Sequence, residues 1–257
     1  MADKSTRYCS ALIYQLLGFM KGIILSGGSG TRLHPLTKVT SKQLLPVYDK
    51  PMIMYPLETL LKAGIKDILI IVASDHAGDY LKLLGSGKEF GARFAYEVQD
   101  KPEGLAHAFL IGENFIENDS VCMVLGDNIF EDDVSETIKG FKSGGHIFAK
   151  EVPDPERFGV VKFDDKMNAV QIEEKPKNFL SNFAITGLYI YDSRVIEAAK
   201  QAQPSARGEL EITELHNWYL KKGELKVDIL KGEWIDAGTF ESLFKASELA
   251  RKKSLKK

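Results

Sequence analysis

Three glycines, three hydroxyl residues and two cations lie close together near the start of this 257-residue chain. The run Lys-Gly-Ile-Ile-Leu-Ser-Gly-Gly-Ser-Gly-Thr-Arg-Leu (residues 21–33) is followed by Ser-Lys-Gln-Leu-Leu-Pro (residues 41–46). Glycines let a main chain approach phosphate oxygens closely and present its N–H groups to them. Arg32 and Lys42 add positive charge that would neutralise a polyphosphate. The segment therefore predicts a site for the phosphates of a nucleotide.

Two well-known phosphate loops do not fit this spacing. The Walker pattern requires lysine after its second glycine, but Gly27 is followed by Gly28. The dinucleotide fingerprint Gly-x-Gly-x-x-Gly fits Gly28 and Gly30, but Leu33 stands at the third glycine position. A glycine-rich turn that only connects a strand to a helix is the structural alternative. The two nearby cations argue against that alternative.

Two aspartates could bind a metal ion beside these phosphates. Asp127 follows the apolar run Val-Cys-Met-Val-Leu (residues 121–125), and Asp236 lies in Trp-Ile-Asp-Ala-Gly (residues 234–238). Mg²⁺ favours a few carboxylates together with phosphate oxygens, and it screens the charge that develops during transfer. An aspartate before glycine or asparagine also commonly stabilises a turn. The magnesium prediction therefore depends on the glycine-rich loop as well as on the two carboxylates.

Other side chains allow both a functional and a structural interpretation. Lys175 could bind a second, smaller phosphate while Glu174 faces a sugar hydroxyl, although a Glu-Glu-Lys run is commonly a solvated surface. Glu209 could bind a sugar, or it could interact favourably with the start of a helix. Three aromatic residues could line a sugar pocket or simply pack in the core: Phe158, Tyr189 and Trp234.

The elements that must position these residues alternate between strand and helix in the first half of the chain. Strands are expected at residues 23–25, 67–73, 94–98 and 121–125, and helices at residues 53–63, 76–84 and 105–115. This alternation favours an α/β fold with a Rossmann-like, mostly parallel mixed sheet flanked by helices. Ligands of such sheets bind beyond the carboxyl ends of the strands, where the glycine-rich loop and Asp127 fall.

The second half of the chain is richer in strands. They are expected at residues 147–150, 159–163, 169–173 and 185–191, with helices at residues 211–222 and 241–253. We interpret this part as a small β-rich sugar-binding layer that closes over the ligand within a single domain of residues 20–257. Residues 1–19 imitate a signal peptide only weakly, and their apolar run (residues 11–19) is too short to span a bilayer. They are expected to be a leader or extension of unknown role.

Composition limits the classes of function. Apolar residues make up 44% of the chain and charged residues 27%, which is typical of a globular protein. The formal net charge of −2 argues against a nucleic-acid partner, which usually requires a basic face. Cys9 and Cys122 form neither a zinc pattern nor a disulfide framework, so a reducing cytoplasm is expected, without a membrane partner. The five histidines have no metal-ligand spacing.

Together, the motifs resemble those of the sugar-nucleotide pyrophosphorylases, which are nucleotidyltransferases. Within that family they are most similar to the short form of the glucose-1-phosphate thymidylyltransferases, also called dTDP-glucose pyrophosphorylases. The resemblance runs from Met20 to about Ala250 and rests on these ordered motifs: GGSGTRL (27–33), SKQLLPVYDKPMI (41–53), LGDN (125–128), DPERFGV (154–160), EEKP (173–176), AITGLY (184–189), RGELEIT (207–213) and WIDAGT (234–239).

This resemblance implies a single displacement in which glucose 1-phosphate attacks the α-phosphorus of dTTP and pyrophosphate leaves. It implies Mg²⁺ bound by Asp127 and Asp236, catalysis by Arg32, Lys42 and Lys175, and a homo-oligomer, commonly a tetramer. The implied nucleotide contacts are Leu25, Gly27, Gly28, Ser29, Gly30, Thr31, Gln43, Gln99, Gly104 and Asp127. The implied sugar contacts are Asn128, Gly159, Glu174, Ile185, Tyr189, Glu209 and Trp234.

Three positions depart from the family pattern. Ser26 replaces a usual alanine, His107 replaces a frequent glutamine, and Phe158 replaces a tyrosine, which removes a hydroxyl from the sugar side. Because the resemblance is to the short form, we do not expect the extra helical region that supports an allosteric product site in longer members. Two alternative functions stay open: a uridylyltransferase that uses UTP, and a non-catalytic sugar-nucleotide-binding regulator on the same fold.

Overall fold

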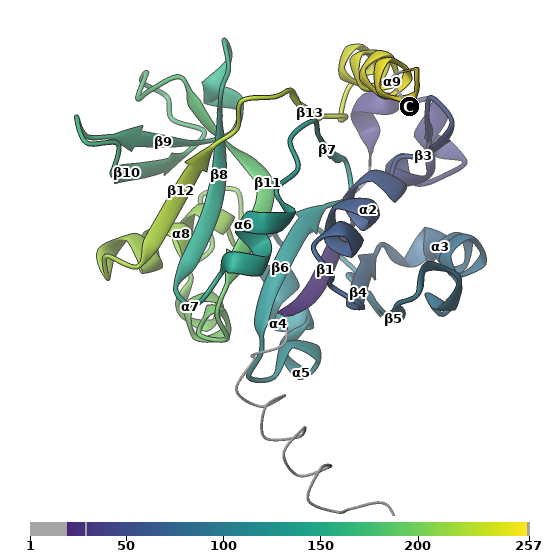
Figure 1. Ribbon diagram of the computed structural model, residues 1–257, viewed down its shortest axis with the longest axis horizontal. Coiled ribbons are helices and arrows are strands. Elements are labelled where there is room, and N and C mark those ends of the chain that lie inside the picture. Colours follow the sequence, from purple (N-terminus) through teal and green to yellow (C-terminus); the bar gives the residue numbers. More distant parts are fainter. Residues whose placement is uncertain (1–19, 29, 256–257) are drawn as a thin grey trace, which may run out of the picture.

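The computed structural model describes residues 20–28 and 30–255 (Figure 1). The expected leader, with Cys9, and the expected phosphate contact Ser29 lie outside these described residues. The first half alternates strand and helix, as the sequence predicts. Its elements in chain order are β1 (Met20–Ser26), β2 (Pro46–Val47), β3 (Lys50–Pro51), α2 (Met54–Lys62), β4 (Asp67–Val72), α3 (Ala77–Leu84), β5 (Arg93–Val98), α4 (His107–Ile111), α5 (Glu113–Ile116) and β6 (Ser120–Leu125).

The second half contains more strands, again as the sequence predicts, but also elements that we did not expect. Its elements are β7 (Asn128–Phe130), α6 (Ser135–Gly140), β8 (Gly145–Glu151), β9 (Gly159–Phe163), β10 (Ala169–Glu174), β11 (Phe183–Tyr191), α7 (Val195–Gln201), α8 (Ile212–Lys221), β12 (Leu225–Ile229), β13 (Trp234–Asp236) and α9 (Phe240–Ser254). The unexpected ones are α6, α7, β7, β12 and β13.

Most of these strands form one nine-stranded sheet in the order β10-β9-β11-β6-β1-β4-β5, with β8 pairing with β11 and β12 (Figure 1). The strands β6, β1, β4 and β5 are parallel to their neighbours in this group. Strand β11 then joins β6 in the antiparallel direction. The predicted β-rich part is therefore a continuation of the central sheet through β11, and the fold is a mixed α/β sheet flanked by helices.

Successive side chains of a strand point to opposite sides of a sheet, and in the central strands β1, β4 and β6 both sets are buried under helices. Ile23 of β1 and Met123 of β6 pack in one cluster with residues of α4, α7 and α8. Ile24 and Val124 pack in a second cluster with residues of α2, α3 and α6. Such double-sided burial explains the continuous apolar runs of these strands.

The helix expected at residues 105–115 is instead two short helices, α4 and α5, separated by Gly112. A Cβ at Gly112 would lie 3.2 Å from the Ala108 carbonyl oxygen and from side-chain atoms of Ile23 and Leu69. Glycine therefore allows this segment to pack closely against the sheet. Within the described part of the chain, no helix has the length and hydrophobicity needed to cross a bilayer.

Candidate active site

The glycine-rich loop directly follows β1, at the carboxyl end of a central strand. Gly28 has φ 103° and Gly30 has φ 59°, conformations that residues with a Cβ rarely adopt. The Thr37 hydroxyl donates a hydrogen bond to the Gly30 carbonyl oxygen at 2.7 Å and so fixes the loop. A short 3₁₀ helix (Thr31–Leu33) then carries Arg32.

Two cavities open beyond the carboxyl ends of the parallel strands. The smaller, of about 200 Å³, borders the glycine-rich loop. The larger, of about 620 Å³, lies toward β9, β10 and β11. Both cavities are lined by Leu105, Leu125 and Asp127, so they meet at Asp127. The position matches the expectation that ligands bind at this edge of the sheet.

The predicted nucleotide contacts and the predicted sugar contacts separate between these cavities. The smaller cavity is lined by Leu25, Gly27, Gly28, Lys42, Gln43, Gln99, Gly104, Asp127 and Glu209. The larger cavity is lined by Arg32, Asp127, Asn128, Gly159, Glu174, Lys175, Ile185, Tyr189, Trp234 and Asp236. Glu209 thus lines the same cavity as the expected nucleotide contacts, although the resemblance implies a sugar contact. Gly30 and Thr31 are not among the lining residues of either cavity.

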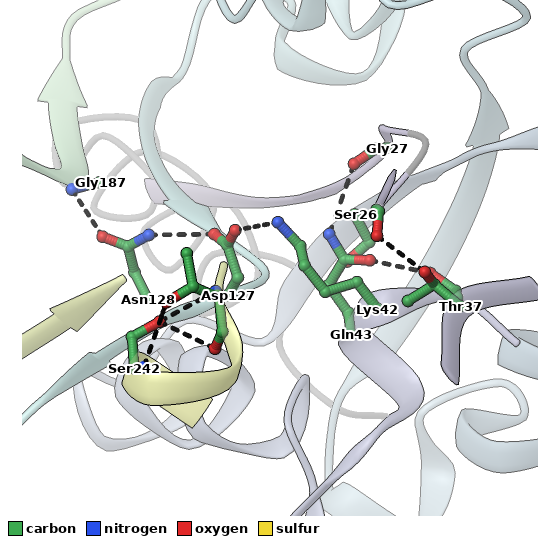
Figure 2. A network of polar contacts seen from close by, with 12 residues as sticks. Ser26, Gly27, Thr37, Lys42, Gln43, Asp127, Asn128, Gly187 and Ser242 are labelled. Carbon is green, nitrogen blue, oxygen red and sulfur yellow. Dashed lines mark hydrogen bonds and ion pairs between the residues drawn. The ribbon is translucent and has the colours of Figure 1, made fainter. Parts of the chain in front are cut away.

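Asp127 is held from both sides by a continuous run of polar contacts (Figure 2). The Lys42 ammonium group forms an ion pair with Asp127 Oδ2. Asn128 Nδ2 donates to Asp127 Oδ1 at 3.0 Å. Asn128 Oδ1 in turn accepts from the Gly187 backbone N–H at 2.9 Å and from Trp234 Nε1 at 2.6 Å. These contacts fix both the Asp127 carboxylate and the Asn128 carboxamide.

Asp236 is brought beside Asp127 by the pairing of β13 with β7. The Ala237 backbone N–H donates to the Asp127 carbonyl oxygen at 2.9 Å. Burial and the nearby Asp127 charge raise the pKa of Asp236 to about 7. The Asp127 pKa is lowered, because the Lys42 ion pair outweighs the effect of burial. The site therefore places two carboxylates close together, with a direct cationic partner for one of them.

Arg32 approaches the same pair from the glycine-rich loop. A Cβ at Gly238 would lie 2.7 Å from Arg32 Nη2 and 3.1 Å from Asp236 Oδ1. The guanidinium group and the Asp236 carboxylate thus share one small region over Gly238. Arg32 and Lys42, which are ten positions apart in the sequence, consequently reach the two aspartates from the larger and the smaller cavity, respectively.

The far side of the larger cavity carries charged groups from the end of β10. Lys175 has φ 44°, and its backbone N–H donates to the Phe158 carbonyl oxygen at 2.9 Å. Its ammonium group lies 3.9 Å from Glu174 Oε1, and Arg207 lies 3.5 Å from the same oxygen. Burial, followed by the nearby Glu211 carboxylate, raises the pKa of Glu174.

Aromatic side chains form another part of the larger cavity. The Phe158 and Trp234 rings meet edge to face with centroids 5.1 Å apart, and Tyr189 is 3% exposed. The cavity also contains residues to which the sequence interpretation gave no role, such as Arg157, Gly187 and Thr213. Each of these residues lies within a motif of the sequence: Arg157 in DPERFGV, Gly187 in AITGLY and Thr213 in RGELEIT. The motifs could therefore have identified them as cavity residues.

Comparisons with known proteins agree on one family. A family model described as nucleotidyl transferase matches residues 21–253. A glucose-1-phosphate thymidylyltransferase of Neisseria meningitidis is 55% identical over 238 residues, which cover 90% of this chain and 83% of the relative. That of Mycobacterium tuberculosis is 52% identical over 237 residues, which cover 90% of this chain and 82% of the relative.

Solved structures agree with this result. A Bacillus anthracis protein assigned to the glucose-1-phosphate thymidylyltransferases, in complex with a sucrose, has a TM-score of 0.86 and 50% identity, covering 90% of this chain and 95% of its own. A UDP-glucose pyrophosphorylase complexed with UDP-glucose has a TM-score of 0.80 and 26% identity, covering 91% and 99%. Fold and site therefore define a nucleotidyl transferase. Within that class, the chain belongs to the glucose-1-phosphate thymidylyltransferase family.

Proposed function

We propose that this protein transfers a thymidylyl group from dTTP to glucose 1-phosphate and releases pyrophosphate. The observation that best supports the proposal is the meeting of two cavities at one buried carboxylate, Asp127. The smaller cavity borders the glycine-rich loop and suits a nucleotide, whereas the larger one is lined by aromatic and charged groups and suits a sugar phosphate. Family membership at 46–55% identity supports the same pair of substrates.

In the proposed reaction, a phosphate oxygen of glucose 1-phosphate attacks the α-phosphorus of dTTP. A new P–O bond forms as the bond between the α-phosphorus and the bridging oxygen to the β-phosphorus breaks, and pyrophosphate leaves with that electron pair. Phosphoryl and nucleotidyl transfers depend on positioning and charge stabilisation more than on a covalent enzyme intermediate. We assign this role to Arg32 and Lys42, which would neutralise the triphosphate and the leaving pyrophosphate.

On the sugar side, we assign the phosphate contact to Lys175 and hydroxyl contacts to Glu174 and Asn128. The ammonium group of Lys175 lies at the cavity wall, beside the Glu174 carboxylate. Two anionic substrates repel one another, so cations on both sides of Asp127 would lower the cost of bringing them together. The Phe158–Trp234 pair would supply an apolar surface for the pyranose ring.

The donor set of Asp127 and Asp236 fits Mg²⁺. Magnesium is usually bound through one or two carboxylates together with substrate phosphates, and these two aspartates both line the larger cavity. When bound, the ion would screen charge on the phosphate oxygens. The neighbouring Asn128 keeps Asp127 oriented through its Nδ2 donor.

A pyrophosphate-release assay tests this function. Purified protein with Mg²⁺ is given dTTP, UTP or dCTP in combination with glucose, galactose or mannose 1-phosphate. We expect the highest kcat/KM for dTTP with glucose 1-phosphate. Preference for UTP would support the uridylyltransferase alternative, and the absence of turnover with every pair would support a non-catalytic regulator.

Two further properties belong to this proposal. We propose a homo-oligomer, a tetramer by resemblance to the family, and a cytoplasmic location, based on the two-cysteine composition of the chain. Light scattering coupled to size exclusion tests the first: a mass equal to that of one 28.6 kDa chain would contradict it.

A further inference from the structure

Two glutamine side chains lie close to Gly27 in the smaller cavity. Gln43 follows the glycine-rich loop and is 2% exposed, whereas Gln99 follows β5 and is 8% exposed. Gln43 Nε2 lies 3.4 Å from the Gly27 carbonyl oxygen. A Cβ at Gly27 would lie 2.9 Å from Gln99 Oε1. The two carboxamides therefore turn different ends toward the same residue, a nitrogen from Gln43 and an oxygen from Gln99.

The orientation of Gln43 is set by two hydroxyl groups. Gln43 Oε1 accepts from Ser41 Oγ at 2.8 Å and from Tyr80 OH at 3.3 Å. Tyr80 OH and Ser41 Oγ lie 2.7 Å apart, and Tyr80 can donate because burial raises its pKa to about 12. Since Oε1 is engaged away from the cavity, the Gln43 amide presents N–H groups toward it. Gln43 thus acts as a donor.

The orientation of Gln99 is set by a histidine and a glutamate. Gln99 Nε2 lies 3.3 Å from His107 Nδ1, and His107 Nε2 lies 3.1 Å from Glu103 Oε2. An amide nitrogen can only donate and an ionised carboxylate can only accept, so His107 Nδ1 accepts while Nε2 carries the proton. This single tautomer satisfies both neighbours. With Nε2 engaged, Gln99 presents its oxygen toward Gly27 and acts as an acceptor.

We propose that His107, supported by Glu103, is a positioning residue that fixes Gln99 as an acceptor and so selects nucleobases with an imide edge. This inference rests on the proposed function and explains how the site would prefer one nucleobase over another. A donor from Gln43 beside an acceptor from Gln99 matches a base that offers a carbonyl oxygen next to a ring N–H. Thymine and uracil have that edge, because N3 carries a proton between two carbonyl groups. Cytosine has an unprotonated N3, which would face the Gln99 oxygen as a second acceptor.

Changing His107 should therefore reduce discrimination without abolishing chemistry. In His107→Leu the Gln99 amide loses its fixed partner and can present either end to the base. We expect KM for dTTP to rise about 5-fold to 10-fold, with kcat within about 2-fold, because one oriented hydrogen bond is lost. The ratio of kcat/KM for dTTP to that for dCTP should fall about 10-fold, because cytosine is then tolerated better.

Matched variants separate positioning from a general structural effect. His107→Gln supplies an amide oxygen that can accept from Gln99 Nε2, and it should recover most of the dTTP/dCTP ratio. His76→Leu is the control, because His76 forms a similar histidine–carboxylate contact with Asp79 at 3.4 Å and is not a lining residue of either cavity. We expect this control to leave the ratio unchanged.

Calorimetric binding of dTTP and dCTP without glucose 1-phosphate completes the test. It reports base selection even if turnover is absent, so failure of the proposed function can be told apart from failure of this inference. Tighter binding of dTTP in the native protein, with loss of that preference in His107→Leu and recovery in His107→Gln, supports the inference. An unchanged dTTP/dCTP preference in folded His107→Leu would overturn it.

Discussion

The ammonium group of Lys42 and the carboxylate of Asp127 form an ion pair between residues 85 positions apart, at the junction of the two cavities. Asp127 is 9% exposed, so its charge depends on this partner. The pKa of Lys42 is raised, because its attraction to Asp127 outweighs the opposing effect of burial. One ion pair thus holds the loop after β1 to the loop after β6.

Lys42→Met should damage both stability and catalysis. The substitution leaves the buried Asp127 charge without its cation, which costs about 3 kcal/mol of unfolding free energy at neutral pH. Loss of a preorganised cation at the triphosphate should lower kcat by about 10²-fold to 10³-fold. Urea unfolding and pyrophosphate release measure the two effects.

A double variant tests whether the two effects have separate causes. Lys42→Met combined with Asp127→Asn removes both charges, so we expect at least half of the lost unfolding free energy to return. Activity should stay low, since neither cation nor carboxylate is restored. Recovery of turnover in the double variant would contradict the assignment of either residue to the reaction.

Asp236→Asn should increase the stability of the protein and decrease its activity. The folded state raises the pKa of Asp236 to about 7, above the value of about 4 expected in the unfolded chain. Ionisation therefore opposes folding increasingly as pH rises from about 4 to 7. Asparagine removes that penalty, so the variant should gain up to about 4 kcal/mol in unfolding free energy at pH 7.5 and little at pH 4.

The same variant should lose most of its turnover, because one of the two proposed magnesium ligands is lost. We expect a decrease of at least about 10²-fold in kcat/KM and a higher magnesium concentration for half-maximal rate. Pyrophosphate release across a magnesium titration measures both quantities. Turnover equal to that of the native protein at every magnesium concentration would rule out Asp236 as a ligand.

Local patterns in the sequence predicted the parallel half of the sheet well, because β1, β4 and β6 are continuous apolar runs buried on both faces and β5 has a shorter alternating pattern. They did not predict strand order, since pairing β11 with β6 and β8 depends on contacts between distant segments. The short strands β7 and β13 were also missed. Each has three residues, too few for a periodic pattern, and they form only by pairing with one another.

For the site, sequence motifs identified the residues that line the cavities better than they identified the partners that orient them. The glycine-rich loop and Asp127 lie at strand ends, which a strand prediction alone locates. The contact between Asn128 and Gly187 spans 59 positions, and that between Gln99 and His107 depends on how β5 meets α4. The sequence shows His107 only as a replacement for a frequent glutamine, because the role that we propose for it is to orient the side chain of a neighbouring residue.

Gly187→Ala should impair the site through a steric effect. A Cβ at Gly187 would lie 2.5 Å from Asn128 Oδ1 and 2.7 Å from a methyl carbon of Leu125, so Asn128 must move. We expect a loss of about 2 kcal/mol in unfolding free energy and a decrease of at least about 10-fold in kcat/KM. Denaturant unfolding and steady-state kinetics check both values.

Gly78→Ala is the matched control for this glycine substitution. Gly78 lies within α3, and no atom falls within 4 Å of the position that its Cβ would occupy. Alanine favours a helix interior over glycine by about 1 kcal/mol, so this variant should be as stable as the native protein or more stable. Equal losses in both variants would show that the Asn128 contact is not the cause.

His216 should make the protein less stable at mildly acidic pH. Its side chain is fully buried in α8, with Nδ1 2.6 Å from Tyr191 OH, and burial lowers its pKa to about 3. An unfolded histidine binds its proton near pH 6.5, so folding stability is complete above that pH and falls as pH decreases toward 3. Between pH 7.5 and pH 5, the native protein should lose about 2 kcal/mol of unfolding free energy from this group alone.

The variant His216→Gln is the control. Glutamine cannot titrate and can still accept a hydrogen bond from Tyr191, so the unfolding free energy of the variant should decrease less over the same range. Parallel slopes for the native protein and the variant would contradict a neutral, buried His216.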